Sequence, residues 1–232
     1  TRNAHGLPMA DLSLIYELKY DAPLPIEKAV TLLLQDKSIE YAEPEYVQHL
    51  CYVPNDTLVP QQYQLINIHA FQGWDVSKGD TNIVVGITDT GTDIDHPDLV
   101  NQIKYNYADP VDGIDNDGDG YMDNYRGWDL GDNDNDPSTD AIVHGSFTTG
   151  CSSAQADNTT GIAGSGYNCK YLPIKISSGS YLTVAYDGIV YAADHGCQII
   201  NCSWGSTGAG QYGQDIINYA SINKNCLVVA AA

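Results

Sequence analysis

The chain has 232 residues, enough for one good-sized domain with a stable core and a smaller one beside it. Thirty acidic and ten basic residues give a formal net charge of −20, which argues against nucleic acid or an anionic membrane as a partner. No apolar run reaches the ~18 residues that a membrane-spanning helix requires. The surplus of carboxylates favours bound divalent cations, which relieve the repulsion between them.

The six cysteines are too few for a disulfide-stabilised scaffold, and their spacing matches no zinc site. They are compatible with export of the protein. Cys202 lies inside an apolar segment, so we interpret it as a buried thiol. The opening residues do not form a signal peptide, although an earlier one could have been removed.

Residues 13–50 have the pattern of a small α+β unit. Its predicted elements are a strand over 14–20, a helix over about 26–36 and a second strand over 39–47. The segment that follows is irregular, with short helical stretches near residue 62 and over 70–76.

From residue 83 onwards, short apolar runs alternate with helical patterns. The runs are typical of strands buried on both faces of a sheet and cover 83–88, 171–176, 198–202 and 226–231. The helical patterns lie near 144–155, 182–195 and 211–223. This alternation predicts a parallel α/β sheet. Residues 109–140, with eleven aspartates and Arg126 as the single basic residue, interrupt the rhythm.

Three short motifs place polar side chains where predicted elements begin or end. Asp89 opens an Asp-Thr-Gly triplet after a buried strand, His144 opens a helix, and the turn Ser203-Trp204-Gly205 follows another strand. Each motif alone also has a purely structural interpretation, as a turn, a solvated helix start or a strand-to-loop junction. The triplet occurs in aspartic proteases too, but those need two such carboxylates sharing one proton, and this chain has only one.

The order of these motifs, followed by the apolar run at 227–232, resembles that of the subtilisin-like serine proteases, or subtilases, and of their thermitase-like members in particular. The resemblance covers roughly residues 52–232 and implies a subtilisin-like parallel sheet flanked by helices. It also implies that Asp89 orients the imidazole of His144, which acts as general base toward a serine. Ser203-Trp204-Gly205 would form one wall of a groove that pairs with an extended peptide or protein substrate.

Two features depart from the family pattern. The segment 144–147 reads His-Gly-Ser-Phe where the family has His-Gly-Thr-His, which is expected to alter local packing but to keep the base. The family's oxyanion-hole asparagine and nucleophilic serine lie further downstream, and no serine up to Ala232 has the family's context. We therefore expect the 232-residue chain alone to be inactive and to require a C-terminal part of the catalytic domain as its partner.

The N-terminal segment extends the resemblance. Residues 39–47 resemble the last strand of the inhibitory propeptide of subtilases, and residues 52–56 resemble the mature start of thermitase-like members. The implied domains are an N-terminally incomplete propeptide over 1–51 and the N-terminal portion of the catalytic domain over 52–232. The resemblance thus implies a secreted precursor, or zymogen, that has its own propeptide as a partner.

The lack of a suitable serine also leads to a prediction for the junction between the two domains. The bond between Cys51 and Tyr52 is expected to be uncut, with residues 46–51 lying in the groove beside the turn at 203–205. An uncut junction would pull Asp56 away from the calcium site that family precedent implies for it.

The aspartate-rich segment contains two overlapping calcium-loop patterns. The first matches the opening positions of an EF-hand loop but has Arg126 where that loop ends in glutamate, and the second resembles a calcium loop of thermitase. A third Ca²⁺ site follows family precedent, and the alternative for all three is a solvated acidic surface. The candidate ligands are Asp115, Asp117, Asp119, Tyr121 and Asp123 at the first site, Asp129, Asp132, Asp134 and Asp136 at the second, and Asp56, Asp98 and Asn158 at the third.

The leading hypothesis is therefore a precursor fragment of a secreted, calcium-stabilised serine endopeptidase that hydrolyses peptide bonds with an Asp-His-Ser triad. The alternative is a catalytically inactive module with the subtilase fold that binds calcium or inhibits a protease. Family geometry also brings the segments of Cys151 and Cys169 together, which allows a disulfide between them.

Overall fold

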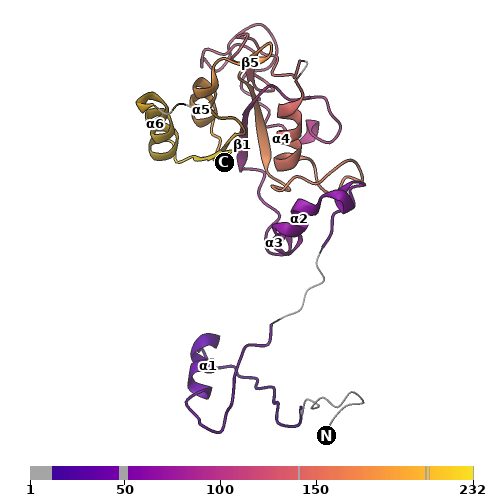
Figure 1. Cartoon of the computed structure of the whole chain (residues 1–232), viewed down its shortest axis with the longest axis vertical. Helices are drawn as coiled ribbons and strands as arrows, with labels where there is room; N and C mark the ends of the chain where they lie inside the picture. The colour runs from indigo at the N-terminus through magenta and orange to yellow at the C-terminus, as the bar shows by residue number, and fades with distance from the viewer. Residues whose placement is uncertain (1–11, 47–51, 141, 207, 209, 232) are drawn as a thin grey trace. The chain divides into compact units, whose positions relative to one another are not determined.

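The computed structural model describes residues 12–46, 52–140, 142–206, 208 and 210–231. The chain divides into two compact units, Thr1–His49 and Leu50–Ala232, which can be followed along the chain by colour in Figure 1. The predicted uncut junction falls on residues 47–51, outside the described part of the chain. Within the described residues, no helix has both the length and the apolar character needed to cross a membrane.

The N-terminal unit contains helix α1, Ile26–Leu33. Pro25 precedes it and Glu27 lies in its first turn, both favourable at a helix start. The helix ends earlier than predicted because residues 34–38 turn, and Asp36 accepts hydrogen bonds from the backbone and hydroxyl of Ser38.

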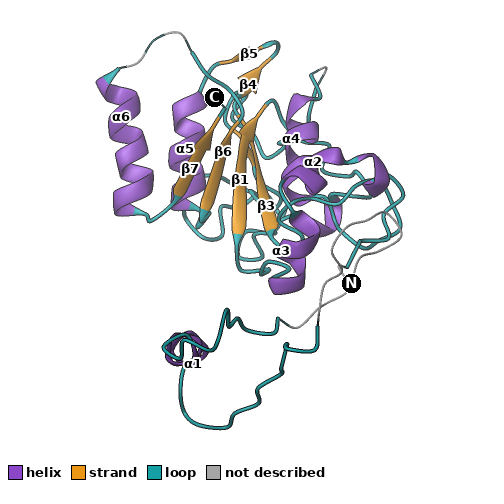
Figure 2. Ribbon diagram, turned by 60° about the horizontal axis from the view of Figure 1, so that its bottom comes forward, coloured by secondary structure: helices purple, strands orange, loops and turns teal. Residues whose placement is uncertain are grey.

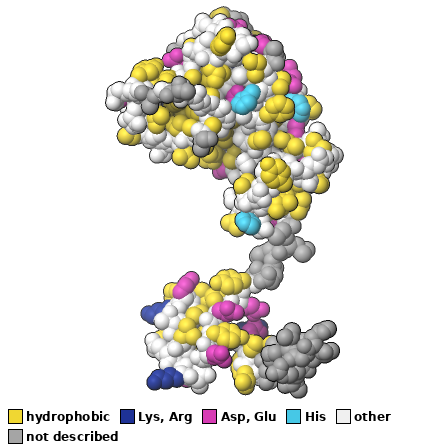
Figure 3. All heavy atoms as spheres, viewed as in Figure 1, with side chains coloured by type: hydrophobic (Ala, Val, Ile, Leu, Met, Phe, Trp, Pro, Cys, Tyr) yellow, Lys and Arg dark blue, Asp and Glu magenta, His cyan; other side chains and the backbone are white. Residues whose placement is uncertain are grey.

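The two strands predicted for the N-terminal unit are wrong for the residues described, because 14–20 and 39–46 contain no strand. A strand requires a partner backbone, and the alternation of apolar residues does not supply one. Leu14 and Tyr16 are among the most exposed apolar side chains, and Figure 3 shows apolar side chains on the surface of this unit.

The second unit is built on a five-stranded parallel sheet with the strand order β2-β3-β1-β6-β7, which confirms the predicted α/β class. Its strands are β1 (Val84–Asp89), β2 (Trp128–Asp129), β3 (Lys170–Lys175), β6 (Ile199–Cys202) and β7 (Leu227–Ala230). Four of them lie within two residues of the predicted apolar runs. The two-residue strand β2, inside the acidic segment, was not predicted.

The helices lie close to the positions predicted from the sequence. They are α2 (Tyr63–Asn67), α3 (Ala70–Val76), α4 (His144–Ser153), α5 (Ala185–Asp194) and α6 (Gln211–Asn218), the last continued by a π-helical turn, Tyr219–Asn223. Short 3-10 turns cover Val59–Gln61 and Val100–Gln102, and strands β4 (Ser177–Ser178) and β5 (Tyr181–Leu182) form a small hairpin.

Helices cover both faces of the sheet, with α5 and α6 on one side and α2, α3 and α4 on the other (Figure 2). Side chains of β1 alternate between these layers. Val84 packs in the core that contains Ile189 of α5, whereas Val85 and Ile87 pack in the core that contains Ala154, next to α4. Burial on both faces explains why β1 and β3 are nearly continuous apolar runs, and it leaves polar chemistry to the strand ends.

Candidate active site

Asp89 is the last residue of β1, at the carboxyl edge of the sheet, and it is only 2% exposed. Oδ1 accepts a hydrogen bond of 2.7 Å from the backbone N–H of Thr90 and lies 2.8 Å from Nδ1 of His144. Oδ2 accepts a hydrogen bond of 3.1 Å from the hydroxyl of Thr148. The carboxylate is therefore fixed in position by three partners, one from the turn after β1 and two from α4.

His144 is the first residue of α4, and its side chain is half exposed. The predicted proximity of His144 to Asp89 is confirmed by the 2.8 Å distance between Nδ1 and Oδ1. Because a carboxylate can only accept, Nδ1 carries the proton in this pair, and the lone pair of a neutral ring lies on Nε2. Among the described residues, no hydrogen bond involves Nε2, which leaves it available to a further group.

The start of α4 is attached tightly to the end of β1. The backbone N–H of Gly145 donates to the hydroxyl of Thr90, and that hydroxyl donates in turn to the carbonyl of Ile142. A Cβ at Gly145 would lie 2.1 Å from the carbonyl oxygen of Gly91. Only glycine lets the helix approach β1 closely enough for His144 to reach Asp89.

Thr148 is a functional candidate that the sequence reasoning missed. It lies four residues after His144, on the same face of α4, and its single hydroxyl proton is shared between Oδ2 of Asp89 and the carbonyl of Gly145. The spacing of His144 and Thr148 was the available signal, because a side chain at that spacing reaches the same carboxylate.

A pocket of about 430 Å³ opens beside the histidine. It is lined by His144, Phe147, Thr148, Cys151, Ser152, Ser165, Asn201 and Ser203. Ser203, one of the predicted groove residues, therefore shares a pocket with His144, and its hydroxyl accepts a hydrogen bond from the side chain of Asn201.

The two other predicted groove residues are not among the pocket lining. Trp204 is anchored to the sheet, because its indole N–H donates to the backbone carbonyl of Thr88, and its ring contacts Tyr186 edge-on. Gly205 is exposed. Phe147, which stands in place of the family's second histidine, is 69% exposed and faces the pocket from α4.

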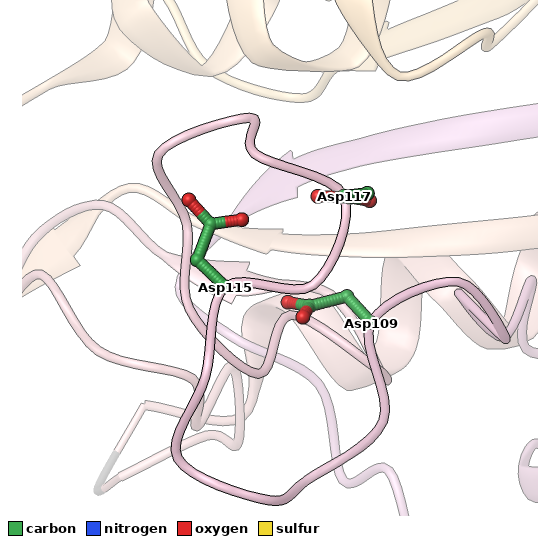
Figure 4. A group of neighbouring side chains, drawn as sticks. All are labelled: Asp109, Asp115 and Asp117. Atoms are coloured by element: carbon green, nitrogen blue, oxygen red, sulfur yellow. The ribbon is translucent and has the colours of Figure 1, made fainter.

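The first acidic loop gathers carboxylates in a different set from the predicted one. Asp109, Asp115 and Asp117 each offer a ligand atom within 4.8 Å of the others, and Figure 4 shows their side chains around one space. Carboxylate oxygens at this spacing fit a calcium ion. The sequence pattern omitted Asp109, which lies six residues before the loop motif.

The other predicted ligands of this loop lie differently. Asp119 accepts one hydrogen bond from the amide of Asn124, and its Oδ2 lies 2.8 Å from Nε2 of His195. Asp123 has a positive φ, and its carboxylate accepts hydrogen bonds from the backbone N–H groups of residues 112 and 113. The ring of Tyr121 packs against Trp128 and Tyr191.

The second acidic loop contains a lysine among its carboxylates. Nζ of Lys175 lies 2.8 Å from Oδ2 of Asp129 and 3.5 Å from Oδ2 of Asp132. Asp134 and Asp136 accept hydrogen bonds from the backbone two residues further on. Within the described residues, no three carboxylates of this loop have ligand atoms within 4.8 Å of one another, so the predicted set fits a divalent cation poorly.

The residues predicted for the third site are close together. Asp56 is buried and accepts backbone hydrogen bonds from Asp157 and Asn158, so the expected displacement of Asp56 is wrong. Asp98 is also buried, and it accepts hydrogen bonds from the Asn158 amide and from the backbone of Ile162. The carboxylates of Asp56 and Asp98 are thus hydrogen-bonded to N–H groups of the protein itself.

The cysteines are free thiols in the described residues, which contradicts the disulfide considered between Cys151 and Cys169. Cys151 is exposed on α4, whereas Cys169 is buried, with its sulfur close to the backbone at Gly79. The prediction for Cys202 is confirmed, since it is buried at the end of β6, and burial raises the pKa of its thiol.

Comparison with known proteins agrees with this geometry. The profile of the Subtilase family matches residues 80–232. The thermophilic serine proteinase of Bacillus sp. (strain AK1) is 34% identical over 212 residues, covering 89% of this chain and 47% of the relative. Thermitase of Thermoactinomyces vulgaris is 34% identical over 186 residues, covering 78% of this chain and 58% of the relative. Further relatives include proteins named as extracellular proteases.

A structural comparison shows the same fold. Fervidolysin from Fervidobacterium pennivorans matches with a TM-score of 0.57 and 23% identity, over 81% of this chain and 26% of the fervidolysin chain. The chain thus spans about half the length of the two curated relatives described above, and a smaller share of fervidolysin.

The fold and site define an α/β protein with a hydrogen-bonded aspartate–histidine pair at the carboxyl edge of a parallel sheet. The chain belongs to the subtilase family, and it is thermitase-like within it.

Proposed function

We propose that this chain supplies the aspartate and histidine of a secreted subtilisin-like serine endopeptidase in precursor form. The observation that carries the proposal is the Asp89–His144 pair, with a ring nitrogen left available beside a pocket that Ser203 also lines. The substrate class is a peptide or protein chain, extended along the turn at 203–205.

In the proposed reaction, His144 acts through Nε2. It removes the proton from the serine hydroxyl while the serine oxygen attacks the scissile carbonyl carbon, and it passes that proton to the departing amine. Water then hydrolyses the acyl-enzyme by the same route. Asp89 fixes the tautomer and orientation of the ring and stabilises the imidazolium that forms. None of the serines in these 232 residues has the context of the family's nucleophile, so the proposal assigns no residue of this chain to that role.

The activity is tested on a protein that contains both this chain and the nucleophilic serine. A fluorophosphonate probe is expected to label one serine, and the same preparation is expected to hydrolyse unfolded casein. Labelling depends on a base that activates the serine, so denatured protein is the control. A folded protein that neither reacts with the probe nor cleaves casein would instead be the inactive module with the subtilase fold.

The precursor and secretion proposals rest on separate observations. The chain separates into two units near residue 49, as expected for a propeptide and a catalytic domain. The extracellular proteases among the relatives support secretion. The exposed apolar side chains of the first unit, such as Leu14 and Tyr16, suit a propeptide surface that packs on a partner.

We further propose that Ca²⁺ binds the cluster of Asp109, Asp115 and Asp117 and stabilises the fold. Calorimetric titration of freshly chelated protein is expected to show calcium binding, because the three carboxylates carry like charges within 4.8 Å, and the N–H groups that bond them do not neutralise those charges. Replacing Asp115 and Asp117 with asparagine together is expected to weaken that binding at least tenfold. The matched control is Asp80→Asn, at a carboxylate outside all three predicted sites. Equal binding by the control and the double variant would exclude this cluster.

A further inference from the structure

Lys175 ends strand β3 and is almost completely buried, with 3% of the residue exposed. Its ammonium group lies 2.8 Å from Oδ2 of Asp129, 2.8 Å from Oδ2 of Asp140 and 3.5 Å from Oδ2 of Asp132. An ammonium group has three donors, so the three carboxylates match its capacity. The lysine is therefore fully paired inside the second acidic loop.

The second oxygen atoms of Asp129 and Asp132 also have partners. Oδ1 of Asp129 accepts backbone hydrogen bonds from residues 131 and 132, and Oδ1 of Asp132 accepts one from the hydroxyl of Ser178. The ammonium group thus lies among the three carboxylates, in the place where a second cation would have to bind.

The cluster also connects to the catalytic pair. Asp140 lies four residues before His144, so the ion pair attaches the segment that leads into α4 to the end of β3. Lys175 is the register partner of Asp89 in the neighbouring strand. The same segment is fixed again at the carbonyl of Ile142, which accepts hydrogen bonds from the hydroxyls of Thr90 and Thr139.

We propose that Lys175 is the resident cation of the second acidic loop, where it replaces calcium and positions the segment that leads to His144. Subtilases of the thermitase type imply a calcium ion at this loop, and the side chains of this chain do not fit one. The inference concerns the loop and holds whether or not the proposed proteolytic activity is found.

Hydrogen exchange of the full chain, measured once with calcium and once with a chelator, tests whether calcium or the ammonium group of Lys175 fixes the second acidic loop. Calcium is expected to slow exchange in residues 109–123 and to leave residues 129–143 unchanged. The double variant Asp134→Asn/Asp136→Asn is expected to bind as many calcium ions as the wild type. Slower exchange over 129–143 in calcium, or the loss of one bound ion in the double variant, would overturn the proposal.

Substitution of the lysine provides the second test. Lys175→Met leaves the buried carboxylate of Asp129 uncompensated, so exchange over 129–143 is expected to accelerate roughly 100-fold or more. Asp140→Asn changes an exposed side chain that folding tolerates, and it is expected to accelerate exchange in the same segment about two- to fivefold. Asp136→Asn, in the same loop but without contact to Lys175, is the matched control. Equal exchange in Asp140→Asn and Asp136→Asn would show that Lys175 does not position this segment.

Discussion

Replacing His144 with alanine is expected to lower kcat for peptide hydrolysis by about six orders of magnitude, in a protein that also contains the nucleophilic serine. That loss is the one known for the corresponding histidine of subtilisin, a member of the same family. The physical reason is that Nε2 is the atom available to take the serine proton, since Nδ1 is committed to Asp89. Steady-state kinetics with a chromogenic peptide measure the effect. A burst analysis detects any contaminating wild-type enzyme.

The control for this substitution is His69→Asn. His69 is exposed and has a φ of 54°, a conformation that asparagine tolerates better than alanine. Activity within about twofold of the wild type is expected, because His69 belongs to the α2–α3 connection and not to the pocket. A loss of less than tenfold in His144→Ala would remove the histidine from its assigned role.

The centre of the sheet was predictable because β1 and β3 are buried on both faces. Such strands are mostly apolar, and runs such as 83–88 are therefore visible in the sequence. The strand predicted over 14–20 was wrong because alternation alone does not make a strand: residues 14–20 have the pattern but form no strand in the described structure. Pairing is a property of the tertiary contacts and is not local.

The catalytic pair was predictable for a different reason, namely that the order of motifs identifies the family. The side chains that surround a cation in the two acidic loops were harder to predict from the sequence. Asp109 joins Asp115 and Asp117 from outside the loop motif, and Lys175 reaches the second loop from a strand about forty residues away. The polar Lys175 at the end of an otherwise apolar run was a signal of a buried charge pair, because an unpaired lysine is rarely buried.

Replacing Asp89 with asparagine is expected to lower kcat by about four orders of magnitude while KM changes little. An asparagine keeps the size of the side chain, but its amide group can donate to Nδ1 of His144. The ring would then carry its proton on Nε2, the atom that must accept from serine. The loss falls on kcat because Asp89 is buried behind the ring and does not contact the substrate.

The matched control for Asp89→Asn is Asp93→Asn, which makes the same chemical change at an exposed carboxylate near the start of α4. Its kcat is expected to stay within about twofold of the wild type, because its carboxylate does not bond the histidine. Measuring kcat and KM separately distinguishes the two ways in which the prediction can fail. An unchanged kcat in Asp89→Asn would show that the 2.8 Å contact with His144 has no catalytic role. A rise in KM at constant kcat would instead place Asp89 in substrate binding. That result would contradict the structure, in which Asp89 is buried at the end of β1.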